Sequence, residues 1–169
     1  MHHRTIAGLV GQYAHGNEPS HHIAYLYVYA GQPWKTQARV RSLLETMYSD
    51  KPDGLQGNED VGQMSAWYVL SSLGFYPVDA VSGNYILGSP LFDRAVVELG
   101  NGRQLTIEAQ RTDPSHVYVQ RFWLNGKLQQ RAWFHHSEIS DGASLRLEMG
   151  AEPALHFAAA PDAAPPSAT

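Results

Sequence analysis

The chain has 169 residues, of which 43% are hydrophobic and 17% are charged, and its net charge is −4 with histidine neutral. This composition is that of a globular chain, and the acidic balance, with no basic stripe, argues against a nucleic-acid partner. The absence of cysteine excludes disulfides and thiol catalysis. No apolar run approaches the roughly 18–20 residues that span a membrane, so no membrane partner is expected.

Helical spacing of apolar residues dominates the first part of the chain. A helix is predicted over residues 19–30, where a proline opens the run and a glycine follows it. A second, amphipathic helix is predicted over residues 33–47. A third is predicted over residues 62–73, and because it is apolar on most sides, we expect it to be buried.

Beyond residue 80 the period shifts towards two, which is typical of strands. Strands are predicted over residues 85–87, 95–99, 104–109, 117–124, 131–134 and 144–148. Asn101-Gly102 and Asn125-Gly126 tolerate positive φ and are strong signals for tight hairpins. We therefore expect a mostly antiparallel sheet, with no helix between residues 104 and 124.

The predicted fold class is α+β, with a helical part over residues 1–79 and an antiparallel β unit over residues 80–157. Residues 158–169 are rich in alanine and proline, and we expect this tail to be disordered. Three helices cannot easily cover so many aromatic residues by themselves. The helical part is therefore interpreted as a piece of a larger helical domain.

Two polar loops, each followed by an apolar run, carry most of the chemistry. In the second loop Asp60 stands just before the third predicted helix. Glycoside hydrolysis by single displacement needs a carboxylic acid and a carboxylate base with a water between them, and Asp60 could be that base. The competing interpretation is that Asp60 caps the helix by accepting a backbone N–H from Gly62 or Gln63.

The first loop offers oxygen ligands and histidines. Asn17 and Glu18 are hard oxygen donors of the kind that calcium prefers. His21 and His22 are neighbours, so on a helix they point about 100° apart and do not easily share one zinc ion. We interpret the pair as one buried, hydrogen-bonded histidine and one that faces a groove. His135 and His136 are predicted to lie in a strand with opposite orientations and a structural role.

The two loops are expected to form one site. We predict that Asn17, Glu18, Asn58 and Asp60 converge on one concave surface, with the Glu18 and Asp60 carboxylates within roughly 12 Å, close enough for one ion or water to link them. Sugars stack their C–H faces on aromatic rings and need fixed polar partners for their hydroxyls. The candidate sugar-contacting residues are Glu18, His21, His22 and Trp67.

The longest motifs resemble glycoside hydrolase family ninety-two, the calcium-dependent exo-acting α-mannosidases. They are Gly11-Gln12-Tyr13-Ala14-His15-Gly16-Asn17-Glu18-Pro19-Ser20-His21-His22, Gly31-Gln32-Pro33-Trp34-Lys35-Thr36-Gln37 and Gly57-Asn58-Glu59-Asp60-Val61-Gly62-Gln63-Met64-Ser65-Ala66-Trp67-Tyr68. Gly74-Phe75-Tyr76-Pro77-Val78, Leu87-Gly88-Ser89-Pro90-Leu91-Phe92, Leu124-Asn125-Gly126 and Met149-Gly150 extend the resemblance to about residue 150.

The resemblance implies the C-terminal helices of an (α/α)6 barrel and an inverting mechanism. It implies that Asp60 is the general base and that Asn58, where the family often has aspartate, helps to place the water. Asn17 and Glu18 match a loop that lines the sugar and calcium (Ca²⁺) site. The family's general acid is a glutamate upstream of these motifs, so this chain alone is expected to be inactive.

The same resemblance implies partners and a location. The expected partners are α-mannoside oligosaccharides, with α-1,2 the expected linkage, and the N-terminal part of the same protein. The full-length protein is expected to be secreted or periplasmic. Two alternatives remain: a carbohydrate-binding module without catalysis, which needs no base, and a purely structural helical–β domain.

Overall fold

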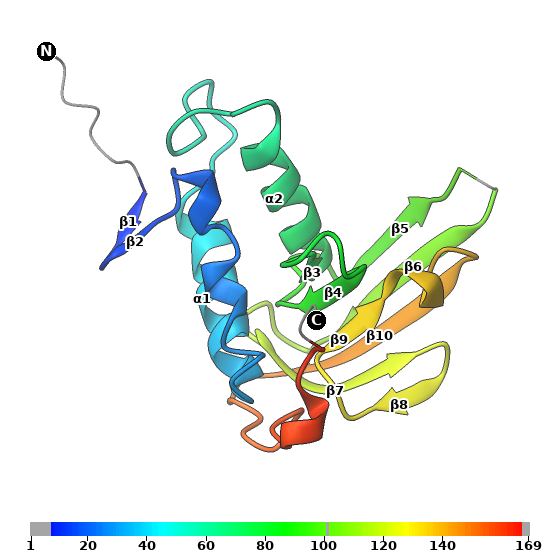
Figure 1. Ribbon diagram of the computed structural model, residues 1–169. Helices are drawn as coiled ribbons and strands as arrows, with labels where there is room; N and C mark the ends of the chain where they lie inside the picture. The colour runs from blue at the N-terminus through cyan, green and yellow to red at the C-terminus, as the bar shows by residue number, and fades with distance from the viewer. Residues whose placement is uncertain (1–7, 101, 167–169) are drawn as a thin grey trace, which may run out of the picture.

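The computed structural model describes residues 8–100 and 102–166. Helices, a three-stranded sheet and a five-stranded sheet follow one another across the molecule, with the larger sheet on the right in Figure 1. A short ribbon of β1 (Leu9–Val10) and β2 (Tyr13–Ala14) lies beside the helices. The molecule thus mixes helix and sheet, as predicted. In these two described segments, no helix is long and apolar enough to cross a membrane.

Two of the three predicted helices are present. Helix α1 (Pro33–Thr46) begins at a proline, whose fixed φ suits a first turn, and it buries Val40, Leu43 and Leu44. Helix α2 (Gln63–Leu73) runs between two glycines in the left-handed conformation. One face of α2, including Trp67 and Ser71, is buried, but Val69 is 54% exposed. The expectation that this helix is buried therefore holds for one face only.

The predicted helix over residues 19–30 is not an α-helix. Two short 3₁₀ helices, η1 (Glu18–Ser20) and η2 (Ile23–Tyr25), are linked by further turns with hydrogen bonds between residues i and i+3. The buried residues of this segment lie at three-residue spacing, His21 with Ala24 and Tyr25 with Val28. Together the four residues follow the i, i+3, i+4, i+7 spacing of an amphipathic α-helix, so the burial pattern predicts an α-helix and does not explain the 3₁₀ turns.

The larger sheet has the strand order β5-β6-β10-β7-β8. Its strands are β5 (Arg94–Glu98), β6 (Gln104–Gln110), β7 (Tyr118–Leu124), β8 (Lys127–Gln129) and β10 (Ala143–Gly150). All neighbours are antiparallel except β10 with β6, because β10 returns to lie between the two earlier strands. The mostly antiparallel prediction is confirmed, and the described residues between 104 and 124 contain no helix.

The hairpin signals are confirmed where the structure describes them. Asn125 (φ 50°) and Gly126 (φ 77°) form the turn between β7 and β8, and positive φ at both positions is what a tight hairpin requires. Asn101 lies outside the described residues. Its neighbour Gly102 has φ 76°, and the Leu99 N–H donates to the Arg103 carbonyl at 2.7 Å across the β5–β6 turn.

The smaller sheet has the order β3-β4-β9, from β3 (Phe75–Tyr76), β4 (Asn84–Leu87) and β9 (Trp133–His135). The strand ends at His135, and His136 opens the 3₁₀ helix η3 (His136–Glu138), so the two histidines do not alternate along a strand as predicted. The His135 ring instead accepts the Ser137 N–H and caps η3. The structural role of His135 is therefore to cap η3.

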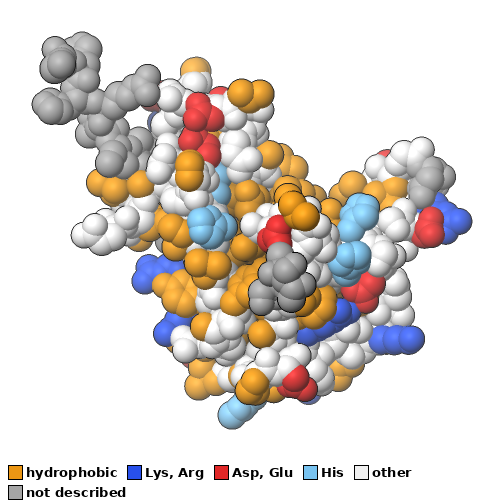
Figure 2. All heavy atoms as spheres, in the orientation of Figure 1, with side chains coloured by type: hydrophobic (Ala, Val, Ile, Leu, Met, Phe, Trp, Pro, Cys, Tyr) orange, Lys and Arg blue, Asp and Glu red, His pale blue; other side chains and the backbone are white. Residues whose placement is uncertain are grey.

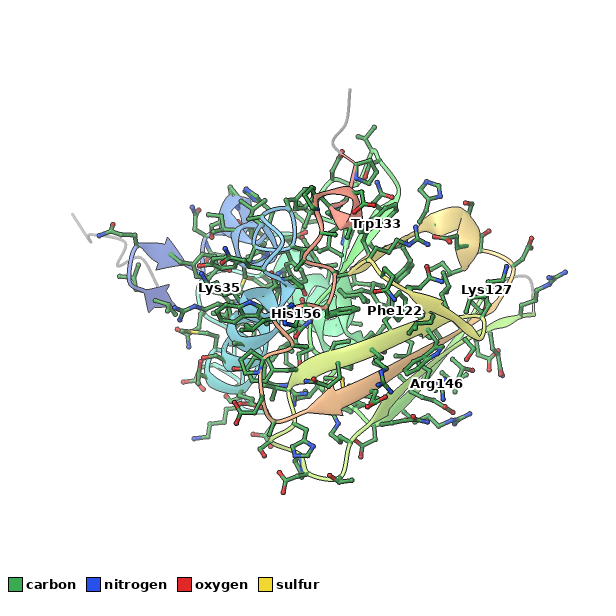
Figure 3. All side chains as sticks on the ribbon, turned by 90° about the horizontal axis from the view of Figure 1, so that it is seen from below. Lys35, Phe122, Lys127, Trp133, Arg146 and His156 are labelled. Carbon is green, nitrogen blue, oxygen red and sulfur yellow. The ribbon has the colours of Figure 1, made fainter. Side chains whose placement is uncertain are left out.

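A single hydrophobic core joins the helices to both sheets. It includes Tyr25 beside the helices, Ile86 in the smaller sheet and Phe122 in the larger one. Phe122 lies on the side of the larger sheet that faces the helices, whereas Arg146 lies on the other side (Figure 3), stacked on Trp123 at 3.9 Å. The parts before and after residue 80 therefore share one core, and their assignment to separate domains stays a prediction.

The described part of the tail, residues 158–166, is packed on the molecule, whereas we expected it to be disordered. It contains a 3₁₀ helix η4 (Pro161–Ala163) and buried Ala158 and Ala163. The indole N–H of Trp133 donates to the Ala163 carbonyl at 3.0 Å (Figure 3). Small alanines leave room for this close approach, which explains how a segment of low-complexity sequence becomes ordered over these residues.

Phe122→Ala should lower the free energy of unfolding by about 3–5 kcal/mol, because it opens a cavity at the junction of sheet and helices. Urea unfolding of the chain measures this change. Arg121→Ala is the matched control on the exposed face of the same strand and should stay within about 0.5 kcal/mol of the wild type. A loss below about 1 kcal/mol for Phe122→Ala would contradict the shared core.

Candidate active site at two contacting loops

The two polar loops found in the sequence touch each other. We call them the paired loops: residues 15–22 and residues 57–62. A Cβ atom on Gly57 would lie 2.6 Å from the Gly16 carbonyl oxygen, and Gly57 has φ 93°. Only glycine combines this conformation with so close an approach. In Figure 2, acidic and histidine side chains lie near one another on this part of the surface, at the upper left.

Asp60 is exposed, and its carboxylate has no hydrogen-bond partner among the described residues. Its backbone is left-handed, with φ 45°, and Val61 (φ 58°) and Gly62 (φ 91°) continue this conformation. Positive φ at a β-branched valine is strained, and the side chain of Val61 is fully exposed, so packing does not explain it. Strain of this kind gathers at functional sites.

The cap of helix α2 is formed by Glu59 and not by Asp60. The two Glu59 carboxylate oxygens accept the Ser65 backbone N–H at 2.9 Å and the Ser65 hydroxyl at 2.8 Å. Only the backbone carbonyl of Asp60 accepts an N–H, that of Gln63 at 3.2 Å. The capping interpretation of the Asp60 side chain is therefore wrong, and the carboxylate is free for chemistry. Asn58 is also exposed.

Glu18 contributes a carboxylate from the other loop. Its Oε1 atom is buried and has no hydrogen-bond partner among the described residues, which is a costly state for a carboxylate oxygen. The Ser20 hydroxyl fixes the turn around Glu18 by bonding to the carbonyls of Ala14 at 2.6 Å and Asn17 at 2.7 Å. The orphan oxygen lies in a rigid turn and is suited to a cation or a donor from outside the chain.

Two of the predicted sugar-contacting residues are buried. His21 is 1% exposed and Trp67 is 0% exposed, so neither presents its side chain to a sugar in this structure. His22 is exposed, so one histidine of the pair is buried and one is not, while a groove at His22 stays a prediction. The reason is packing: the His21 ring stacks on His15 with centroids 4.8 Å apart, and the Trp67 indole meets His15 edge-on at 4.4 Å.

Two buried histidines of the first loop, His15 and His21, are neutral and hydrogen-bonded. The Tyr48 hydroxyl donates to the Met64 carbonyl, so the His15 Nε2–H donates to Tyr48 at 2.6 Å and His15 Nδ1 accepts from Tyr13 at 2.7 Å. Burial, aided by the neighbouring His21, lowers the pKa of His15 to about 4. Burial also lowers the pKa of His21, against the opposing effects of the His15 carbonyl and Glu18.

Asn17 and Glu18 are the right kind of ligand for calcium, but two residues are too few for a complete calcium site. Asn17 and Glu18 offer hard oxygen atoms of the kind that calcium prefers, and the Glu18 Oε1 atom has no hydrogen-bond partner among the described residues. Among residues 8–100 and 102–166, however, no group of three acidic, histidine or cysteine side chains could hold a metal ion. A calcium shell needs about six to eight oxygens, so Asn17 and Glu18 could supply only part of one.

The structure thus brings the two loops together, while the separation of about 12 Å expected for Glu18 and Asp60 stays a prediction. Our sequence interpretation missed Glu59 as the cap and Gln63 as a contact between the loops. An acidic residue six positions before Ser65 is outside the usual capping spacing, so no short-range signal marked Glu59. Gln63 directly follows the glycine that opens α2, which was the available signal.

The family of the chain follows from comparison with known proteins. The model for the glycosyl hydrolase family 92 catalytic domain matches residues 1–151, so the chain belongs to this family, as its motifs predicted. An uncharacterized secreted glycosidase from Arthroderma benhamiae is 31% identical over 140 residues, which cover 81% of this chain and 18% of that protein.

Solved structures agree with this assignment. A family 92 α-mannosidase from Bacteroides thetaiotaomicron matches with a TM-score of 0.92 and 41% identity over 96% of this chain and 22% of its own. An inverting family 92 mannosidase from the same organism matches with a TM-score of 0.85 and 40% identity over 92% of this chain and 21% of its own. The chain therefore spans about a fifth of the length of these relatives.

The stability of the chain should fall as the pH drops from about 7 to about 4. Folded His15 takes up a proton only near pH 4 whereas the unfolded residue does so near 6.5, so the unfolded state holds more protons between these values. The free energy of unfolding should decrease there by about 1.4 kcal/mol per pH unit, and His21 acts in the same direction.

Urea unfolding of the wild type and His15→Gln at about pH 7 and about pH 5 measures the effect. The variant should show a smaller loss of stability on acidification, while the exposed control His22→Gln should behave like the wild type. Equal losses in His15→Gln and the wild type would contradict the assignment of this titration to His15.

Proposed function

We propose that this chain is the part of an inverting, exo-acting α-mannosidase that carries the general base, and that the whole protein hydrolyses terminal α-1,2-linked mannose. The observation that carries the proposal is the exposed, unpaired Asp60 carboxylate, held on a strained turn beside a second acidic loop. Two family members that this chain resembles are mannosidases, one of them inverting.

In this proposal Asp60 removes a proton from water while the water oxygen attacks the anomeric carbon. Attack from the face opposite the leaving oxygen inverts the configuration. Asn58, exposed two residues earlier on the same loop, orients the water through its amide. A carboxylic acid roughly 6.5–9.5 Å from the base must protonate the leaving oxygen, and by family resemblance this is an upstream glutamate supplied by the rest of the protein.

Asn17 and Glu18 are the residues of this chain that would hold calcium. The buried, unpaired Glu18 oxygen supports this assignment, and the remaining ligands are assigned to the rest of the protein. Calcium, when bound, supplies positive charge to mannose hydroxyls. The turn around Glu18 fixes the position of its own oxygens, and the exposed His22 beside it is available to bond a sugar hydroxyl.

Apolar side chains on the outer surface support the assignment of α1 and α2 to a larger (α/α)6 barrel. A groove of about 370 Å³ between the β1–β2 ribbon and α1 is lined by Val10, Ile23 and Leu43, among others. Two further apolar side chains are exposed: Leu26, close to Ile23 in the chain, and Val69 on α2. The N-terminal part of the protein is the proposed occupant. Because a relative is described as secreted, we also propose export of the whole protein.

A carbohydrate-binding module without catalysis is the alternative. It would use exposed polar side chains of the paired loops, such as His22, and it requires no base. The free state of the Asp60 carboxylate argues for catalysis instead, since a binding module has no need for a strained turn that presents an unpaired acid.

Asp60→Asn in the full-length protein should lower kcat for α-1,2-mannobiose by about 10²–10⁴-fold, because an amide cannot accept the proton from water. Binding of mannose should change little, as measured by calorimetry. Asp50→Asn is the control, since Asp50 is exposed on the same connection between the two helices. Turnover within about tenfold of the wild type would remove Asp60 from the base role, and the binding module would then be favoured.

The 169-residue chain alone should release no measurable mannose from α-1,2-mannobiose in calcium, beside an active full-length protein. Without the acid, the leaving oxygen departs unprotonated, and each acid–base group contributes about 10²–10⁴-fold to the rate. Activity of the isolated chain within about tenfold of the full-length protein would overturn this part of the proposal. The acid would then have to lie in this chain, with Glu59 and Glu18 the first candidates.

A further inference from the structure

One residue makes contact with both of the paired loops. The Gln63 backbone N–H donates to the Asp60 carbonyl at 3.2 Å, and the Gln63 side-chain amide reaches the His21 Nδ1 atom at 3.1 Å. The same amide nitrogen donates to the Tyr76 hydroxyl at 2.9 Å. Gln63 is the first residue of α2, so the helix joins the two loops at its N-terminus.

The direction of the Gln63–His21 hydrogen bond follows from the surroundings of His21. The His21 Nε2 atom lies 2.9 Å from the His15 carbonyl oxygen, which only accepts, so Nε2 carries the proton. Burial favours the neutral ring, so Nδ1 has no proton and must accept. Gln63 therefore presents its NH₂ group, and a residue at position 63 without a donor could not replace it.

A second bond makes this connection stiff. The Trp67 indole N–H, one turn further along α2, donates to the His21 carbonyl at 3.2 Å. The His21 backbone N–H in turn donates to the Glu18 carbonyl at 3.0 Å. Ring and backbone of His21 are thus both fixed by α2, and His21 fixes the turn that carries Glu18. A shift of Gln63 would move the Glu18 turn relative to Asp60.

We propose that Gln63 is a positioning residue: by bonding the Asp60 carbonyl and the His21 ring, it sets the distance between the Asp60 carboxylate and the Glu18 loop. Gln63 does not act on the sugar itself. The inference rests on the proposed function, because the distance matters only if Asp60 is the base and Glu18 belongs to the same site. A misplacement of about 1 Å at such a site can cost about 10²-fold in rate.

The first test is Gln63→Leu in the full-length protein, which removes the side-chain donor. It should lower kcat for α-1,2-mannobiose by about 10–100-fold, with KM within about threefold of the wild type. Gln130→Leu is the matched control on an exposed loop residue and should keep wild-type kcat and KM. A Gln63→Leu enzyme with kcat within about threefold of the wild type would overturn the proposal.

The second test separates positioning from general loss of structure. In Gln63→Glu a carboxylate faces the unprotonated His21 Nδ1, so two acceptors meet; a proton gained at lower pH restores the bond. The other titratable groups that face His21 or position 63 are Glu18, the stacked His15 and Tyr76. The ratio of kcat in Gln63→Glu to that of the wild type should rise at least about threefold between about pH 7.5 and pH 5, because protonation restores a donor between the two side chains.

The outcomes distinguish the two proposals. Folding is monitored for each variant by its thermal unfolding temperature, and if Gln63→Leu does not fold, the pH response of Gln63→Glu decides. A flat ratio for Gln63→Glu, or a rise in KM alone, would overturn the positioning role. Full activity of Asp60→Asn would instead overturn the proposed function, whereas an inactive Asp60→Asn with a normal Gln63→Leu would overturn only the role of Gln63.

Discussion

The contact between the Gly16 and Gly57 backbones is the constraint on which the candidate site depends. A Cβ atom at Gly57 would come within 2.6 Å of the Gly16 carbonyl, and the positive φ of Gly57 excludes most other residues on conformational grounds as well. The contact brings together two loops that are about forty residues apart in the chain. Without it, Glu18 and Asp60 would belong to separate surface turns.

A layer of aromatic and histidine rings holds the contact in place. His15, His21, Tyr48 and Trp67 stack or meet edge-on beneath the paired loops, and every ring nitrogen of the two histidines has a hydrogen-bond partner. Such a layer favours neutral histidines, because burial outweighs the effect of the nearby Glu18 on His21. The support of the site is therefore sensitive to acid, whereas Asp60 above it remains in solvent.

Two neighbouring carboxylates of the second loop have different roles: Glu59 caps helix α2, and Asp60 is exposed. Both Glu59 carboxylate oxygens accept hydrogen bonds from Ser65 and stabilise the start of α2, so the Asp60 side chain is not needed for the cap. The left-handed backbone from Asp60 to Gly62 then turns the Asp60 side chain out of the helix cap. The Glu59 side chain reaches forward over the turn to Ser65, whereas the Asp60 side chain is exposed.

The sequence alone determined the strands β4, β5, β6, β7, β9 and β10, the Asn125–Gly126 hairpin and helices α1 and α2, because local periodicity and turn chemistry fix these features. The family followed from the resemblance of the long motifs. The sequence also identified both polar loops. Only the tertiary structure decided that residues 19–30 wind as 3₁₀ turns, that β10 inserts beside β6, and that the alanine-rich tail packs on Trp133. Within the loops it decided that Glu59 caps the helix, that His21 and Trp67 are buried, and that Gln63 joins both loops. The physical reason is that these outcomes depend on burial and hydrogen bonds between residues far apart in the chain, for which a local pattern carries no signal.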